Sequence, residues 1–183
     1  MKTIDDASLT PVARKFILHW GELGTRWGIN RTVAQVHALL YLSQEALDVQ
    51  TICGTLKIAR SNASSALREL EGWGIVRSVH LLGDRRERFE AMADVWQMLT
   101  TIVLARKRRE CDPTLSMLRE CAAEARGGDT KDERFVQSRI GAMLELFETL
   151  TPLADEFAVL PNPAVRGLVS LHGRLRSMLR PAR

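Results

Sequence analysis

Two short groups of polar side chains have the types and spacing to hold an anion and to read a pattern of hydrogen-bond acceptors. The first begins at Arg60 and continues with Ser61, Asn62, Ser64, Ser65 and Arg68. The second is the pair Arg85 and Arg86, directly after Gly83-Asp84. Hydroxyl and amide groups at a helix start hydrogen-bond phosphates and base edges, and one arginine can make two hydrogen bonds to a guanine. These residues therefore predict a surface that contacts nucleic acid.

The first group lies on a helix expected from Ser61 to about Trp73. At about 100° per residue, Ser61, Ser65 and Arg68 fall on one side, with Asn62 and Ser64 on the flanks. The opposite side is apolar and should pack against preceding helices; its members are Ala63, Ala66, Leu67 and Leu70. An ordinary amphipathic helix with a solvated polar face would show the same division. The helix alone leaves both interpretations open.

The second group lies at the tip of an expected β-hairpin. A strand from Ile75 to Leu82 is followed by Gly83-Asp84, a strong tight-turn signal, and by a return strand from Glu87 to Ala91. Arginine at a hairpin tip contacts phosphates or enters a narrow minor groove. Asp84 is expected to pair with Arg86 and orient its guanidinium. The alternative is a charged, solvated hairpin, but a hairpin directly after such a helix favours a winged helix-turn-helix.

Three earlier helices would support this motif. The first begins at Thr10-Pro11, since threonine caps helices well and proline is tolerated at the first position, and ends near Gly28. Its broad apolar face carries Val12, Phe16, Trp20, Leu23 and Trp27. The second runs from Arg31 to Ser43 with Asn30 as its cap, and its buried candidates are Val33, Val36, Leu39, Leu40 and Leu42. Asp48 should cap a short third helix that contains Ile52 and Leu56.

The second half of the chain is expected to be almost entirely helical. Asp94 should cap a long helix that ends in the basic cluster Arg106 to Arg109, and Pro113 should restart a helix to about Arg126. Gly127-Gly128-Asp129 is the clearest linker, and the helices expected after it cover residues 131–151 and 164–180. The basic cluster and the acid-free tail are either an extension of a DNA-facing surface or solvated helix ends; the tail contains Arg166, Arg174, Arg176, Arg180 and Arg183.

The sequence therefore predicts a mainly α protein with two regions. Residues 1–93 would form an N-terminal helix and a winged helix-turn-helix domain, with a three-helix core and a β-hairpin wing. Residues 94–183 would form a helical region for dimerisation and for binding an effector. No internal repeat or low-complexity tract interrupts this division.

Bulk properties agree with a folded protein of this size. The 183 residues are 45% hydrophobic and 26% charged, and the net charge of +4 permits an anionic partner without requiring one. No apolar run approaches the roughly 20 residues that span a bilayer. The N-terminus has acids where a signal peptide has a basic start. We therefore predict a cytoplasmic protein with no membrane partner.

Residues that would indicate catalysis or metal binding do not cluster in the sequence. Histidines show no HxH or HExxH spacing, and no phosphate loop or nucleophile elbow occurs. We expect no enzyme activity, no metal and no cofactor. Cysteines show no CxxC spacing, which fits a reducing compartment; they are either inert or include a redox sensor at Cys53, Cys111 or Cys121.

The stretch from Ala59 to Trp96 resembles the GbsR branch of the MarR-type winged helix regulators. The shared motifs are Ser61-Asn62, the segment Leu67 to Val76, Gly83 to Arg86, Phe89 to Ala91 and Asp94 to Trp96. The segment from Phe16 to Gly21, with Gly24 and Trp27-Gly28, is also similar. Arg88 departs from the pattern, because relatives often have an aromatic residue there. The match is dense over about the first hundred residues, and beyond them the similarity is only helical character.

The resemblance implies a homodimer that binds double-stranded DNA at an inverted-repeat operator and represses transcription. We expect major-groove contacts from the polar face of the helix and wing-side groove or phosphate contacts from Arg85 and Arg86, with Arg60 as a further DNA-binding residue. The expected major-groove residues are Ser61, Asn62, Ser64, Ser65 and Arg68. An effector would bind in a pocket between the winged domain and the helical half, whose lining the sequence does not identify. A cage for a quaternary ammonium group is a further alternative to core packing for the four tryptophans, Trp20, Trp27, Trp73 and Trp96.

A different class of function is a winged helix that binds another protein and never touches DNA. Such a module should have an apolar patch where this chain places Ser61, Ser65 and Arg68. The polar character of that face favours the DNA-binding prediction.

Overall fold

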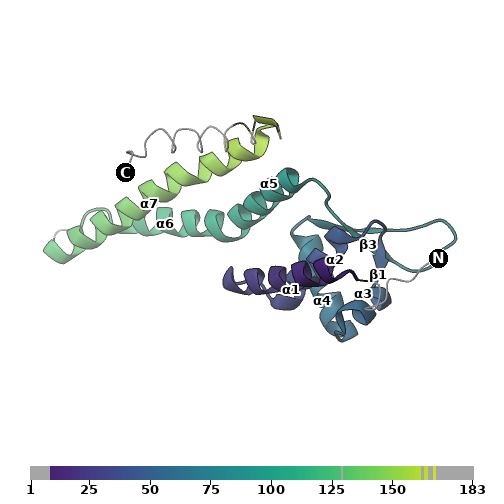
Figure 1. The fold of residues 1–183 in the computed structure, drawn as a ribbon. Helices are drawn as coiled ribbons and strands as arrows, with labels where there is room; N and C mark the ends of the chain where they lie inside the picture. Colours follow the sequence, from purple (N-terminus) through teal and green to yellow (C-terminus); the bar gives the residue numbers. More distant parts are fainter. Residues whose placement is uncertain (1–8, 129, 162, 165–166, 168–183) are drawn as a thin grey trace, which may run out of the picture. The chain divides into compact units, whose positions relative to one another are not determined.

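The computed structural model describes residues 9–128, 130–161, 163–164 and 167, and the chain divides into two compact units at Met98 and Leu99 (Figure 1). The functional division at residue 93 stays a prediction. Among the helices of the described residues, none is both long and apolar enough to cross a bilayer.

The first unit contains four helices and a small antiparallel sheet, and the fifth helix begins within it. In chain order the elements are α1 (Pro11–Arg26), α2 (Arg31–Leu42), β1 (Leu47–Asp48), α3 (Val49–Leu56), α4 (Arg60–Gly72), β2 (Val76–Val79), β3 (Arg88–Ala91) and α5 (Val95–Arg106). The strands lie in the order β1-β3-β2. This arrangement confirms the predicted mainly helical fold with a winged helix-turn-helix.

Side-chain caps define where these helices begin. The Thr10 hydroxyl accepts a hydrogen bond from the Ala13 N–H at 3.2 Å, and Asn30 accepts one from the Thr32 N–H at 2.8 Å. Asp48 accepts from the Thr51 N–H at 2.8 Å. Asp94 accepts from the N–H groups of the first turn of α5, at 2.8 Å for Trp96. All four predicted caps are confirmed, because each supplies an oxygen to a backbone donor that has no partner inside its helix.

The core of the first unit lies where α2, α3 and α4 meet. Its largest fully buried side chains are Val36, Leu39, Ile52, Leu67 and Leu70. The predicted packing face of α4 is confirmed, since Ala63, Ala66, Leu67 and Leu70 are all at most 2% exposed. Leu42 was expected in this core but is 41% exposed, because it occupies the last position of α2.

The buried face of α1 agrees with the predicted one only in part: Phe16, Trp20 and Leu23 are half-buried, but the two ends of the predicted face are not. Val12 and Trp27 are 77% and 69% exposed, whereas Ile17, Gly21 and Gly24 are buried. A methyl group added at Gly24 would lie 2.6 Å from the Ala34 Cβ, so the glycines allow α1 and α2 to pack with their backbones close together. The apolar pattern alone did not reveal this glycine face.

The hairpin is shorter than predicted, and a third strand, β1, joins it to form the sheet. β2 covers Val76–Val79 and β3 covers Arg88–Ala91, so residues 80–87 form an extended wing loop. β1 pairs with β3 through Leu47 opposite Phe89 and Asp48 opposite Arg88. A strand of two residues shows no alternation, so the sequence offered no signal for it.

Among its described residues, the second unit continues α5 and contains α6 (Asp112–Glu124) and α7 (Lys131–Val159), which lie side by side in Figure 1. The predicted break before Pro113 is wrong, because one π-helical turn, Lys107–Cys111, joins α5 to α6. There the Asp112 N–H donates to the Lys107 carbonyl five residues back. This wider turn accommodates the proline without interrupting the helix.

The predicted end of α7 near residue 151 is also wrong, since the helix continues through Pro152 to Val159. The Thr151 hydroxyl donates to the Phe147 carbonyl at 2.6 Å, a backbone contact typical of bent helices. At the other end, Thr130 and Glu133 form a reciprocal capping box. The turn before it contains Gly127 at a φ of 91°, which agrees with the predicted linker. The helix predicted over residues 164–180, and the arginines of the tail, lie almost wholly outside the described residues.

Candidate nucleic-acid interface

The helix α4 presents two opposite faces of different chemistry. Its apolar face is buried, whereas Ser61, Asn62, Ser65 and Arg68 are exposed and Ser64 is half-buried. The Arg68 guanidinium donates to the Ser65 hydroxyl at 3.3 Å, so the two groups act from one side of the helix. The sequence-predicted polar residues thus share one accessible surface.

The start of α4 leaves backbone donors available. Ala59, its N-cap, is extended and makes no side-chain hydrogen bond to the first turn. The first-turn N–H groups of a helix attract anions, and here Arg60, Ser61 and Asn62 surround them. Lys57 adopts a left-handed conformation at the end of α3 and produces the sharp turn into α4. A phosphate group is the anion that this geometry suits.

The wing is organised by a network of two carboxylates and two guanidiniums, here called the wing network: Asp48, Asp84, Arg86 and Arg88. Arg86 donates through Nη1 to Asp48 at 2.6 Å and through Nε to Asp84 at 3.1 Å. This confirms the predicted pairing of Asp84 with Arg86. The bond to Asp48 also connects the wing to the N-cap of α3, a contact that the sequence did not predict.

Arg88 has a structural position in the same network. It is 7% exposed, donates to Asp84 at 2.8 Å and donates through Nη1 to the Ala46 carbonyl at 3.1 Å. These bonds replace the contacts that an aromatic residue would make on the return strand. Hydrogen bonds from Arg86, and then from Arg88, hold the pKa of Asp84 well below its usual value.

Charge at the wing is therefore distributed differently from the prediction. Two carboxylates balance two guanidiniums within the wing network, although Arg86 keeps 51% of its side chain exposed. Arg85 is exposed and makes no ion pair with any described residue. Of the two arginines predicted at the wing tip, Arg85 is the one whose charge is uncompensated.

Comparison with known proteins agrees with this architecture. Residues 21–87, which include α2 to α4, β2 and the wing loop, match the model of the MarR family. These residues fold as a winged helix-turn-helix and are similar to the MarR family.

A solved structure described as a transcriptional regulator has the same fold. It aligns with a TM-score of 0.53 and 15% identity, over 80% of this chain and 99% of that one. At this identity the similarity concerns the fold only. No curated protein matches the chain.

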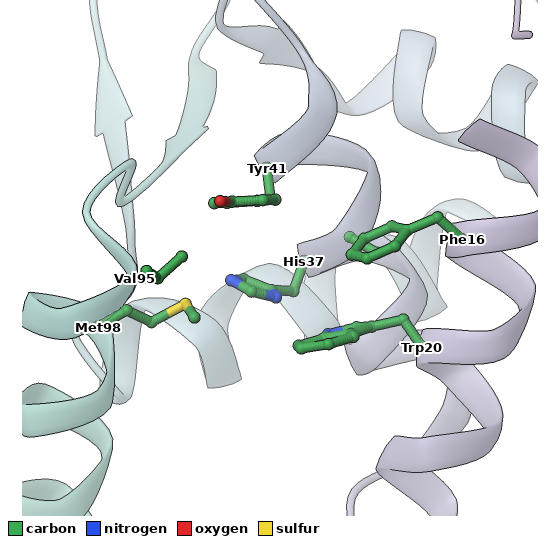
Figure 2. Close-up of a pocket in the computed structure, with 7 residues that line it drawn as sticks. Phe16, Trp20, His37, Tyr41, Val95 and Met98 are labelled. Atoms are coloured by element: carbon green, nitrogen blue, oxygen red, sulfur yellow. The ribbon is translucent and has the colours of Figure 1, made fainter. Parts of the chain in front are cut away.

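Residues of α1, α2 and the first turn of α5 enclose an aromatic pocket that sequence reasoning missed. Figure 2 shows His37 between the rings of α1 and the side chains of Val95 and Met98. The cavity measures about 200 Å³, and its lining is Phe16, Trp20, His37, Ala38, Tyr41, Val95 and Met98. The only available signal was the four-residue spacing of Phe16 with Trp20 and of His37 with Tyr41.

His37 is a buried polar residue in the lining of this pocket. It is 5% exposed, and its Nε2 has no hydrogen-bond partner among the described residues. Burial lowers the pKa of His37 to about 4, so the imidazole is neutral at physiological pH. The pocket includes Trp20 but not Trp27, Trp73 or Trp96, so the four tryptophans do not line a common cage here.

The cysteines lie in ordinary surroundings. All three are free and half-buried, and burial raises the pKa of the Cys53 thiol. Acidic neighbours compensate the basic cluster beside Cys111: Lys107 pairs with Asp112 at 2.9 Å, and Arg109 pairs with Glu110 at 3.2 Å. This arrangement weakens the basic surroundings that a reactive thiolate at Cys111 would need.

Proposed function

We propose that this protein is a cytoplasmic, sequence-specific DNA-binding transcriptional regulator of the GbsR branch of the MarR-type proteins. It acts as a repressor, and as a homodimer on an inverted-repeat operator. The observation that carries the proposal is the exposed face of α4, which bears Ser61, Ser65 and Arg68 opposite a fully buried apolar face. A MarR-family domain with such a face is built to place α4 in the major groove.

Specificity is assigned to the exposed face of α4. Arg68 makes two hydrogen bonds to a guanine edge, and Ser61, Asn62 and Ser65 read neighbouring acceptors. Arg60 and the uncapped first turn bind phosphate and set the depth of the helix in the groove. Ser64, which is half-buried, contacts the flank of the same groove.

Affinity that does not depend on sequence is assigned to the wing. Arg85 contacts phosphate or the minor groove with its uncompensated charge. Arg86 presents the exposed part of its guanidinium beside it, while the wing network holds the hairpin in place. This division makes Arg85 the main electrostatic contact of the wing and Arg86 the secondary one.

The second unit is proposed to hold two copies together. Exposed apolar side chains follow α7 at helical intervals: Val136, Met143, Leu146, Leu150 and Leu153. A second copy packed along this stripe would remove it from water. Two recognition helices placed by such a dimer reach successive major grooves about one helical turn apart.

Release from DNA is assigned to the aromatic pocket. An effector with an apolar body suits its walls, which consist largely of aromatic and aliphatic side chains. Because α1, α2 and the first turn of α5 line this pocket and α2 also packs against α4, an effector there would change how α2 supports α4.

The wing assignment predicts the effect of Arg85→Ala. Loss of one phosphate contact in each copy should weaken binding to every duplex alike and lower the salt slope by about 0.9 per contact. Affinity measured by fluorescence anisotropy at several salt concentrations gives both quantities. Arg119→Ala is the matched control, since it removes the same charge from α6, where Arg119 pairs with Glu148. Equal affinity and an equal salt slope for wild type and Arg85→Ala would show that the wing does not touch DNA.

A protein-interaction module without DNA binding is the alternative function. It would need an apolar patch on the exposed face of α4, and that face consists of hydroxyl, amide and guanidinium groups. The composition of the face therefore supports the DNA-binding proposal.

A further inference from the structure

The tip of the wing is apolar. Leu82 is fully exposed and Leu81 is 49% exposed. The Asp84 N–H donates to the Leu81 carbonyl at 3.0 Å, and Gly83 has a φ of 85°, so residues 81–84 form a tight turn with Leu82 at its corner. Turn corners usually carry Gly, Pro, Asn, Asp or Ser, which makes two adjacent leucines there unusual.

The tip is also fixed in position. Asp84, at the end of the turn, binds Arg86 and Arg88, and Arg86 continues to Asp48 at the start of α3. The wing network therefore holds the turn against the helix-turn-helix of the same unit. A rigid tip can press an apolar side chain into a groove without first losing the entropy of a flexible loop.

We infer that Leu82 is a wedge that enters the DNA minor groove beside the major-groove contact of α4. This inference rests on the proposed function. Apolar side chains of this size partly unstack a base step and bend the duplex, and the bend brings more of the protein against the DNA. The occupant is duplex DNA because the uncompensated charge of Arg85 lies three residues from Leu82 on the same loop, where it attracts the phosphates that border the groove.

The experiment uses the full chain and a duplex of the DNA upstream of its own coding region, with the bound site mapped first by footprinting. Dyes at the duplex ends report bending by energy transfer, and 2-aminopurine beneath the wing reports unstacking. Leu82→Ala should weaken binding about fivefold, reduce the bend and abolish the 2-aminopurine signal. The salt slope should stay unchanged, because no charge is removed. Leu82→Phe should keep the bend.

Leu42→Ala is the control, since it removes the same atoms from an exposed position at the end of α2. Wild-type affinity, bend and fluorescence for Leu82→Ala would overturn the wedge and leave the proposed function standing. Weaker binding with an unchanged bend would also overturn it. If Leu82→Ala left DNA binding unchanged but reduced the molecular mass from dimer to monomer, the wedge would be wrong and the tip would form a contact between copies. Absence of DNA binding by the wild-type chain would overturn the proposed function, and the wedge with it.

Discussion

Replacing Arg68 by Ala is expected to remove most of the discrimination between the operator and unrelated DNA. A bidentate arginine–guanine contact contributes about 1–3 kcal/mol of discrimination, and a dimer loses the contact twice. Arg68 is exposed on α4 and already donates to Ser65, so its guanidinium is oriented before DNA arrives. Affinity for unrelated DNA should fall far less, since one cation among many supports that binding.

The measurement is a pair of titrations, one with the mapped operator and one with a shuffled duplex of equal length. Arg68→Lys is the informative control, because lysine keeps the charge and loses the two-pronged geometry. The lysine variant should keep the wild-type salt slope and still lose specificity. If Arg68→Ala lowers binding to both duplexes by the same factor, Arg68 contacts phosphate and the base-reading role is wrong.

Acidification is expected to destabilise the fold through His37. The unfolded chain takes up a proton on this residue near pH 6.5, whereas the folded chain takes it up only near pH 4. Protonation of His37 in the unfolded chain therefore lowers the free energy of unfolding progressively as the pH falls from about 6.5 to about 4. Above pH 6.5 this destabilisation is absent. The free energy of unfolding should fall by about 2 kcal/mol between pH 7 and pH 5, and by about 3 kcal/mol in all.

Urea denaturation at a series of pH values tests this. His37→Leu is the comparison, because leucine suits the apolar walls of the pocket and does not titrate. The difference in pH dependence between the two proteins isolates His37 from His19 and His80, which are exposed. Asp84 does not affect the comparison above about pH 5. Its pKa is lowered by folding, so the stability that it contributes is lost only at lower pH. Parallel curves for wild type and His37→Leu would contradict the buried neutral histidine.

Local chemistry explains which features could be predicted from the sequence. The two faces of α4 follow from helical periodicity, and the four caps follow from single oxygen-bearing side chains before each helix. The pairing of Asp84 with Arg86 is also local, since only Arg85 separates them in the chain. These features depend on near neighbours in the chain, and near neighbours are visible in a sequence.

The missed features depend on residues that are distant in the sequence. Asp48 meets Arg86 only because β1 pairs with β3, and a two-residue strand has no pattern. The aromatic pocket requires α1 and α2 to pack closely at Gly24. A pattern of apolar residues does not indicate such a contact, because glycine has no side chain. A helix was expected to end before Pro152 and another to begin at Pro113, but α7 continues through Pro152, and a π-helical turn carries the helix into Pro113.

The central claim is that α4 reads DNA sequence. Its most direct test is binding of the full chain to the DNA upstream of its own coding region, against a shuffled duplex, at about 50 mM and about 200 mM salt. We predict binding to its own upstream DNA at least about 10³-fold tighter than to the shuffled duplex, with both affinities falling as salt rises. A folded dimer that binds neither duplex near physiological salt, or binds both equally at each salt concentration, would contradict the claim.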